Sequence, residues 1–187
     1  QLHGIEVVNG DRYSEKAFDL ALYHDLTLIG TSDVHELIHW DYSKVLNEHR
    51  PVTLIFSKSR KISAVKDALI DKRTVVWFKD TLIGRKEYLK PLIMKSIKVE
   101  NAVYLSGSSI LNVTLRNTSS AVLEVSEKNG YRFHNQAKTL RLPGKSVGKL
   151  QIALDERKTF VEVPVEIKNA LITPEETLEI TLNIKSK

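Results

Sequence analysis

The sequence contains no cysteine, and this absence limits the chemistry open to the chain. Disulfide bonds and thiolate metal sites are excluded, so any metal ion must be held by histidine, aspartate, glutamate or water. The cellular compartment stays open, because a chain without cysteine is compatible with oxidising and reducing environments alike.

Long hydrophobic runs and a strong excess of one charge are also missing. No apolar run approaches the roughly 20 residues that a membrane span needs, so no span is expected. The 28 basic and 23 acidic residues leave a net charge of +5, and the excess is spread along the chain. A nucleic-acid-binding protein usually gathers its basic residues on one face, so we expect no nucleic-acid partner.

The 187 residues include 42% hydrophobic and 27% charged residues, which is enough apolar material for one large or two small domains. Strands are expected from continuous apolar runs, at 4–10, 26–30, 52–58 and 74–78. Helices are expected between and after them, at 14–24, 63–73 and 84–97. Continuous apolar runs suit strands buried on both faces, so residues 1–98 predict a parallel α/β architecture.

Local signals refine these helices. Ser14 and Ser63 are the expected N-caps of the first and second helix, because a serine hydroxyl accepts a hydrogen bond from a free N–H group of the first turn. Pro91 is expected to break or kink the third helix, since proline lacks the N–H group and crowds the preceding turn.

The pattern changes after about residue 98, where apolar and polar residues alternate. Strands are expected at 109–117, 121–127, 149–155, 160–167 and 177–185. Alternating strands separated by turn residues predict an antiparallel β-sandwich over residues 99–187. We expect this part to have no catalytic centre and none of its strands to join the α/β sheet.

The stretch LIGTSDVHELIHWDY, residues 28–42, places Asp33 and His35 just after a buried strand. Parallel α/β folds build their sites at the carboxyl ends of strands, and carboxylate and imidazole are ligands for a divalent metal. A D-x-H triplet is also common in solvated loops, so a metal site and a plain polar loop both stay open. We expect the two side chains to converge at the tip of strand 26–31.

Further candidate metal ligands are present near Asp33 and His35. His39 follows His35 by four residues, and His3 and Glu6 lie on the neighbouring strand. For Glu6 a buried acid paired with lysine or arginine is an equal alternative. Asn9 is a candidate for a hydrogen bond to substrate or to a metal ligand, and a plain turn residue is slightly favoured.

Two alternative roles are open for each of three further residues. Trp40 and Tyr42 either line a pocket mouth or cover the rim of the fold, and we favour the rim. Arg85 either meets a phosphate group or forms a surface or inter-domain ion pair at the start of a helix.

A family resemblance rests on longer motifs. GIEVVNG, then a helix, then LTLIGTSDVH resembles the closing part of the PHP (polymerase and histidinol phosphatase) superfamily of metal-dependent phosphoesterases. VKDALIDKRTVVWF is similar to the last helix and strand of that family. TLIGRKEYLKPLI, followed by a β-rich tail, resembles a bacterial subgroup with a C-terminal sandwich. The resemblance covers about residues 2–97 well and the tail loosely.

The resemblance implies a fold and an activity. Residues 1–98 would form the C-terminal part of a distorted (β/α)7 barrel, and residues 99–187 an immunoglobulin-like sandwich. Asp33 and His35 would bind one of two or three divalent ions (Zn, Mn or Fe) of the complete family site. A metal-activated water would hydrolyse a small phosphomonoester or phosphodiester substrate.

The family's other ligands come from strands that would precede Gln1. We therefore expect a C-terminal fragment with little activity of its own. The sandwich tail and the resemblance imply a periplasmic or secreted location. A different class of function also stays open, namely a non-catalytic docking module built on an α/β remnant and a β-sandwich.

Overall fold

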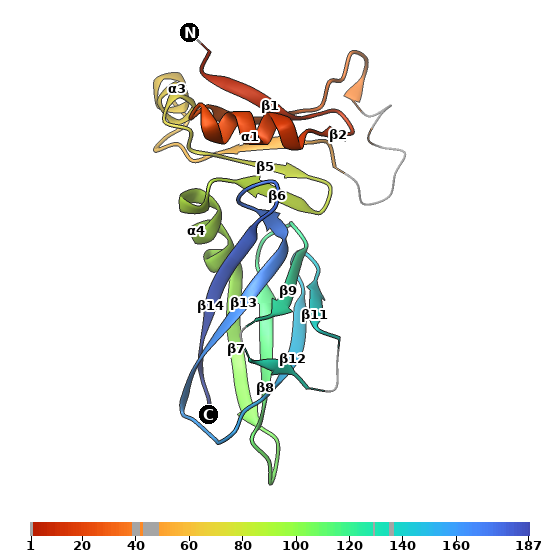
Figure 1. The fold of residues 1–187 in the computed structure, drawn as a ribbon, viewed down its shortest axis with the longest axis vertical. Coiled ribbons are helices and arrows are strands. Elements are labelled where there is room, and N and C mark those ends of the chain that lie inside the picture. Colours follow the sequence, from red (N-terminus) through yellow and green to blue (C-terminus); the bar gives the residue numbers. More distant parts are fainter. Residues whose placement is uncertain (1, 39–41, 43–48, 129, 135–136) are drawn as a thin grey trace. The chain divides into compact units, whose positions relative to one another are not determined.

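The computed structural model describes residues 2–38, 42, 49–128, 130–134 and 137–187. The chain divides into two units (Figure 1). Unit 1 comprises residues 1–89 and 170–176, and unit 2 comprises residues 90–169 and 177–187. Among the residues described, no helix combines the length and apolar character needed to cross a membrane.

Unit 1 begins with a strand–helix–strand motif. Strands β1 (Gly4–Asn9) and β3 (Thr27–Thr31) run parallel, and helix α1 (Glu15–Tyr23) connects them. The short strand β2 (Arg12–Tyr13) pairs antiparallel with the end of β1. This part of the chain agrees with the parallel architecture expected from its continuous apolar runs.

The expected cap of α1 is confirmed. Ser14 is the N-cap, and its side chain accepts a hydrogen bond from the backbone N–H of Ala17 over 3.2 Å. The buried face of the helix carries Phe18 and Ala21, which pack in one core with Val8 and Leu28. Burial of this apolar face holds the helix against the sheet.

The rest of unit 1 departs from the parallel prediction. Strands β4 (Val52–Ile55), β5 (Thr74–Phe78) and β6 (Thr81–Gly84) pair antiparallel. Only Lys79 and Asp80 join β5 to β6, and so short a connection allows only an antiparallel hairpin. Lys79 has the positive φ of 51° that such turns need. A buried apolar run marks a central strand without fixing its direction.

Threonine hydroxyls link β3 to the β4–β5 pair. The Thr74 hydroxyl donates to the Leu28 carbonyl over 2.9 Å, and the Thr53 hydroxyl donates to the Gly30 carbonyl over 2.9 Å. A β-carbon on Gly30 would lie 2.4 Å from a methyl group of Val76, so only glycine fits there. A closed PHP barrel is not seen in the described part of the chain.

Two further helices in the described residues differ from their predicted details. Helix α3 (Ile62–Ile70) has Lys61 as its N-cap, without a capping side chain, and Ser63 lies inside the helix. The prediction for Ser63 is therefore wrong by two residues. Helix α4 (Lys86–Ser96) contains Pro91 and continues past it. Leu89 and Ile93 on either side of this proline are fully buried, and their packing offsets the single hydrogen bond that proline removes.

Unit 2 contains the strands of an antiparallel sandwich. One sheet has the order β10–β12–β8–β7, and its members pair antiparallel. They are β7 (Ile97–Tyr104), β8 (Ile110–Asn117), β10 (Arg132–Phe133) and β12 (Val147–Ala153). In the other sheet β9 pairs antiparallel with β11 and β13, and β14 pairs with β13. Its members are β9 (Leu123–Glu127), β11 (Thr139–Leu142), β13 (Phe160–Leu171) and β14 (Thr177–Lys185).

The expected alternation is confirmed, most plainly in β14. There Leu178, Ile180, Leu182 and Ile184 are buried, while the residues between them are exposed. Strands that bury every second residue form the inner faces of a sandwich. The β-sandwich predicted for the tail is thus present in unit 2.

The end of β13 requires a correction. Ala170 and Leu171 pair in parallel with Leu82 and Ile83 of β6 within unit 1. The expectation that no strand of the tail joins the first sheet is wrong. Strand β13 has 12 residues against 5 in its partner β9, so its end has free backbone groups for β6. Unit 2 thus lacks residues 170–176 and includes residues 90–98, unlike the ranges 1–98 and 99–187 expected from the sequence.

Candidate functional site

A β-bulge shapes the end of β1. The pairing with β3 shifts between Glu6 and Val8, which leaves Val7 as the extra residue. Val7 and Val8 are both fully buried, so the side chains of Glu6 and Asn9 lie on the same, more exposed face. Bulges occur often beside functional sites, because they redirect a side chain that a regular strand would aim elsewhere.

Glu6 is the centre of a small hydrogen-bonded cluster on that face. One carboxylate oxygen accepts from the Thr31 hydroxyl over 2.9 Å, and the other accepts from the Asn9 amide over 3.0 Å. Glu6 is exposed, and none of the described lysines or arginines forms an ion pair with it. The reading of Glu6 as a buried acid paired with a base is therefore wrong.

Asp33 and His35 follow Thr31, a member of this cluster, in the sequence. The Gly10 N–H donates to the Thr31 carbonyl over 3.0 Å, and a β-carbon on Gly10 would lie 3.6 Å from that of Asp33. Asp33 has a positive φ of 51° and follows the end of β3 by two residues. The turn therefore directs Asp33 toward the carboxyl ends of the parallel pair.

The two side chains converge. His35 Nε2 lies 3.5 Å from Asp33 Oδ1, with 85% of the His35 side chain and 52% of the Asp33 side chain exposed. Both groups thus remain open to a ligand from solvent. Their role as metal ligands stays a prediction.

A third protein ligand does not join them in the described part of the chain, where no group of three histidine, aspartate or glutamate side chains could hold a metal. His39 and Trp40 lie outside the described residues. The backbone of His3 accepts from the N–H of Thr27, so His3 lies at the opposite end of β3. Tyr42 is held near the site, because its hydroxyl donates to the Ser32 carbonyl over 3.1 Å.

Arg85 also lies at the opposite end of β3 from Asp33, because its guanidinium binds the backbone of Leu26, directly before β3. Its guanidinium donates to the carbonyls of Ala21 and Leu26, over 3.2 Å and 3.1 Å, and pairs with Asp25 over 3.1 Å. Only 14% of the side chain is exposed. Arg85 thus binds the end of α1, and the structure does not bring it together with the candidate metal ligands.

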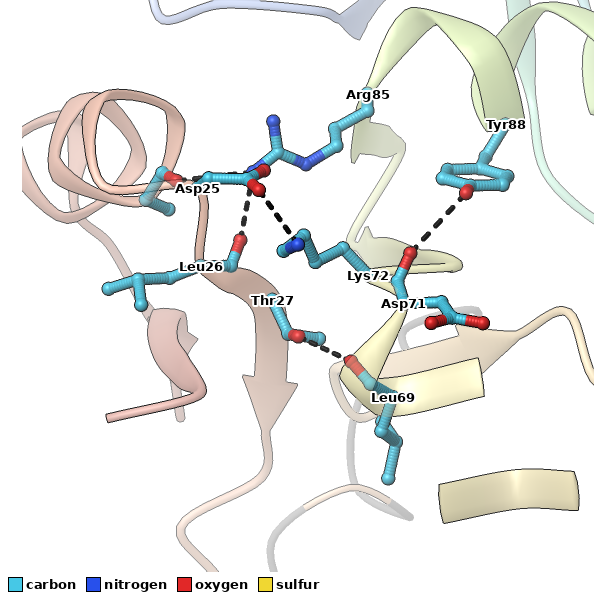
Figure 2. A network of polar contacts seen from close by, with 9 residues as sticks. Asp25, Leu26, Thr27, Leu69, Asp71, Lys72, Arg85 and Tyr88 are labelled. Atoms are coloured by element: carbon cyan, nitrogen blue, oxygen red, sulfur yellow. Dashed lines mark hydrogen bonds and ion pairs between the residues drawn. The ribbon is translucent and has the colours of Figure 1, made fainter. Parts of the chain in front are cut away.

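The surroundings of Arg85 form one network of polar contacts (Figure 2). The Lys72 ammonium lies 2.7 Å from the Asp25 carboxylate, and this hydrogen bond lowers the pKa of Asp25, with charge contributions from Lys72 and Arg85. The Thr27 hydroxyl donates to the Leu69 carbonyl over 2.5 Å. These contacts join α1, β3 and the end of α3, which is a structural role.

The sequence interpretation missed Thr31. Its register partner in β1 is Asn9, and its hydroxyl binds Glu6. The signal was its place directly before Ser32 and Asp33, but the bulge that brings Glu6 within reach has no recognisable sequence pattern.

Comparison with known proteins gives a family match for the C-terminal part of the chain alone and a structural match for nearly all of it. Residues 97–183 match the family model of an Ig-like domain. No curated protein matches the chain. The chain is similar to the crystal structure of a two-domain protein containing a predicted PHP-like metal-dependent phosphoesterase from Bacteroides vulgatus. The sequence identity is 29% and the TM-score is 0.85. The similarity covers 97% of this chain and 52% of the chain of that protein.

Proposed function

We propose that this chain is the C-terminal part of a metal-dependent phosphoesterase and contributes Asp33 and His35 to its metal site. The observation that carries the proposal is the convergence of these side chains over 3.5 Å at the carboxyl ends of β1 and β3. Similarity to a two-domain protein with a predicted PHP-like phosphoesterase supports it. The proposed substrate is a small phosphomonoester or phosphodiester.

The Asp33–His35 pair fits a divalent ion. Carboxylate oxygen and imidazole nitrogen bound to one tetrahedral zinc ion lie about 3.3 Å apart, close to the 3.5 Å observed here. When bound, such an ion would polarise the phosphate ester and make a nearby water more acidic. Asp33 would contribute a carboxylate oxygen, and His35 would contribute Nε2.

The Glu6 cluster would support the site in two ways. Its hydrogen bond to Thr31 fixes the residue that leads into Ser32 and Asp33, and thereby limits where Asp33 can point. Glu6 and Asp33 also place two carboxylates at this edge, without a lysine or arginine ion pair among the described residues. Such an edge favours a cation and repels a bare phosphate, so a phosphate ester would need the metal ion in order to bind.

Calorimetric titration with zinc tests the proposal. We expect the wild-type chain to bind one ion at the site, and Asp33→Ala or His35→Ala to weaken binding at least about tenfold, or 1.4 kcal/mol. His24→Gln is the matched control, because His24 is an exposed histidine at the other end of the parallel pair. Equal affinities in all four proteins would contradict the proposal.

A docking module is the second candidate. Within the described residues only Asp33 and His35 converge, whereas a catalytic zinc usually has three protein ligands. The Ig-like match over residues 97–183 fits a domain that binds other molecules. A chain that binds no zinc would favour this candidate.

A further inference from the structure

Two strands of unit 2 each lie at an edge of their sheet. In the described part of the chain, β7 pairs with β8 alone within its sheet, and β14 pairs with β13 alone. On its other side an edge strand presents N–H and C=O groups without a ladder partner. β7 and β14 contact each other, and Figure 1 shows them side by side.

A hydrogen bond joins the edge of β7 to the chain just after β14. The Lys187 N–H donates to the Ala102 carbonyl over 3.0 Å, so the edge of β7 already accepts a backbone hydrogen bond from the segment after β14. A bulge at Glu100 shifts the register of β7 and bends it. On the other side of the bulge the strands leave a groove of about 420 Å³.

The lining of the groove suits a polypeptide backbone. It consists of consecutive residues of both strands, 97–99 and 180–183, together with Met94 of α4. Because the lining runs along each strand without skipping residues, the backbone edges form part of the walls. Ile97, Ile180 and Leu182 are buried, which gives the groove an apolar base for alternate side chains.

The charge of the groove indicates the kind of segment. Lys98 is the one charged residue in the lining, and its side chain is exposed. Among the described residues no carboxylate forms an ion pair with Lys98. An acidic side chain on the incoming segment would supply that partner.

We propose that this groove binds an extended, acidic peptide segment of a partner protein, which adds as a strand between β7 and β14. Main-chain hydrogen bonds to the two edges would give most of the affinity, and Lys98 would select a segment with a carboxylate. The proposal involves unit 2 alone and is independent of the metal site.

An amide NMR titration of the whole chain tests this proposal. The probe is a capped seven-residue peptide of alternating threonine and valine with a central glutamate, added up to about 1 mM. We expect saturable shifts at residues 97–99 and 180–183. A peptide that is N-methylated at alternate positions should lose these shifts, because it lacks the donors for strand pairing, and a central lysine should weaken binding about fivefold.

Matched variants complete the test. Lys98→Glu should weaken the glutamate peptide about fivefold, while Lys185→Glu, an exposed lysine of β14 outside the lining, should not. The proposal is overturned if no shifts appear, if they persist with the N-methylated peptide, or if they lie elsewhere. It is also overturned if the same amides shift with protein concentration alone, because the occupant would then be a second copy of the chain.

Discussion

Asn117 is a fully buried polar residue whose hydrogen bonds are all made inside unit 2. Its amide nitrogen donates to the carbonyls of Ala121, Leu142 and Pro143, over 2.7 to 3.1 Å. Its side-chain oxygen accepts from the backbone and the hydroxyl of Ser119. One side chain thus holds together the loops at the end of β8.

We expect Asn117→Ala to lower the free energy of unfolding by about 2–4 kcal/mol, because it leaves several buried carbonyls without a donor. Urea denaturation followed by circular dichroism measures the change. Asn183→Ala on the exposed face of β14 is the control, with an expected change within about 0.5 kcal/mol. A loss at Asn117 no larger than at Asn183 would show that the network contributes little.

Asp25 gives a pH-dependent contribution at the other end of the chain. The hydrogen bond from Lys72 holds the folded pKa of Asp25 below its ordinary value. The ionised carboxylate therefore stabilises the folded chain above pH of about 4, and this stabilisation is lost as pH falls through the lower folded pKa.

A carboxyl NMR titration should show this lowered pKa directly. Lys72→Met should move the pKa of Asp25 back toward its ordinary value, since the largest cause of the shift is removed. Lys66→Met, an exposed lysine of α3, is the control and should leave Asp25 unchanged. An unchanged pKa in Lys72→Met would disprove the assigned cause.

For individual residues, the sequence predicted some contacts and missed others. Asp33 and His35 were identifiable because a strand end, a turn and two ligand-type residues coincide, and their side chains do converge. The binding of Thr31 to Glu6 was not identifiable, because it depends on a bulge. The guanidinium of Arg85 donates a hydrogen bond to a carbonyl at the end of α1. This partner is distant in the sequence, so the local sequence pattern could not show it.

Strands and helices were easier to predict than their directions. The span of β14 matches its prediction, because strict alternation marks a strand with one buried face. The antiparallel pairing of β4, β5 and β6 was missed, because direction depends on the connections. The Lys79–Asp80 turn and the strand after it were missed, because no element was expected between the strand at 74–78 and the helix at 84–97.

The packing of β3 on β5 is testable as an element contact. Gly30→Ala should destabilise the protein by about 1–3 kcal/mol, because its β-carbon would lie 2.4 Å from Val76 Cγ1. In the double variant Gly30→Ala/Val76→Ala the clash is removed. Val76→Ala should therefore lower the free energy of unfolding less in the Gly30→Ala protein than in the wild-type protein. Thermal or urea unfolding of the four proteins gives this coupling, and strict additivity would contradict the contact.

The whole molecule consists of two units that share the chain unevenly. Residues 170–176 return from the sandwich to unit 1, where the end of β13 pairs with β6. The sequence predicted two parts because the hydrophobic period changes near residue 98. It did not predict the return, because the strand expected at 160–167 ends before Ala170 and Leu171, the residues that pair with β6.

The incomplete ligand set leads to a prediction about activity. We expect the chain alone to hydrolyse a chromogenic phosphodiester no faster than its Asp33→Ala variant when manganese or zinc is added. The reason is that the described residues supply two converging ligands, whereas a two-metal site needs several more. Robust turnover that Asp33→Ala abolishes would show that this chain completes the site by itself.

The metal site proposed at Asp33 and His35 is tested directly by locating a bound ion among the histidines. In a proton–carbon NMR spectrum of the imidazole groups, substoichiometric manganese broadens the signals nearest to it. We expect His35 to broaden first, and Asp33→Ala to abolish this selectivity while the spectrum of the folded core is unchanged. Broadening that begins at His49 or His134 and spares His35 would contradict the assignment of Asp33 and His35 as metal ligands.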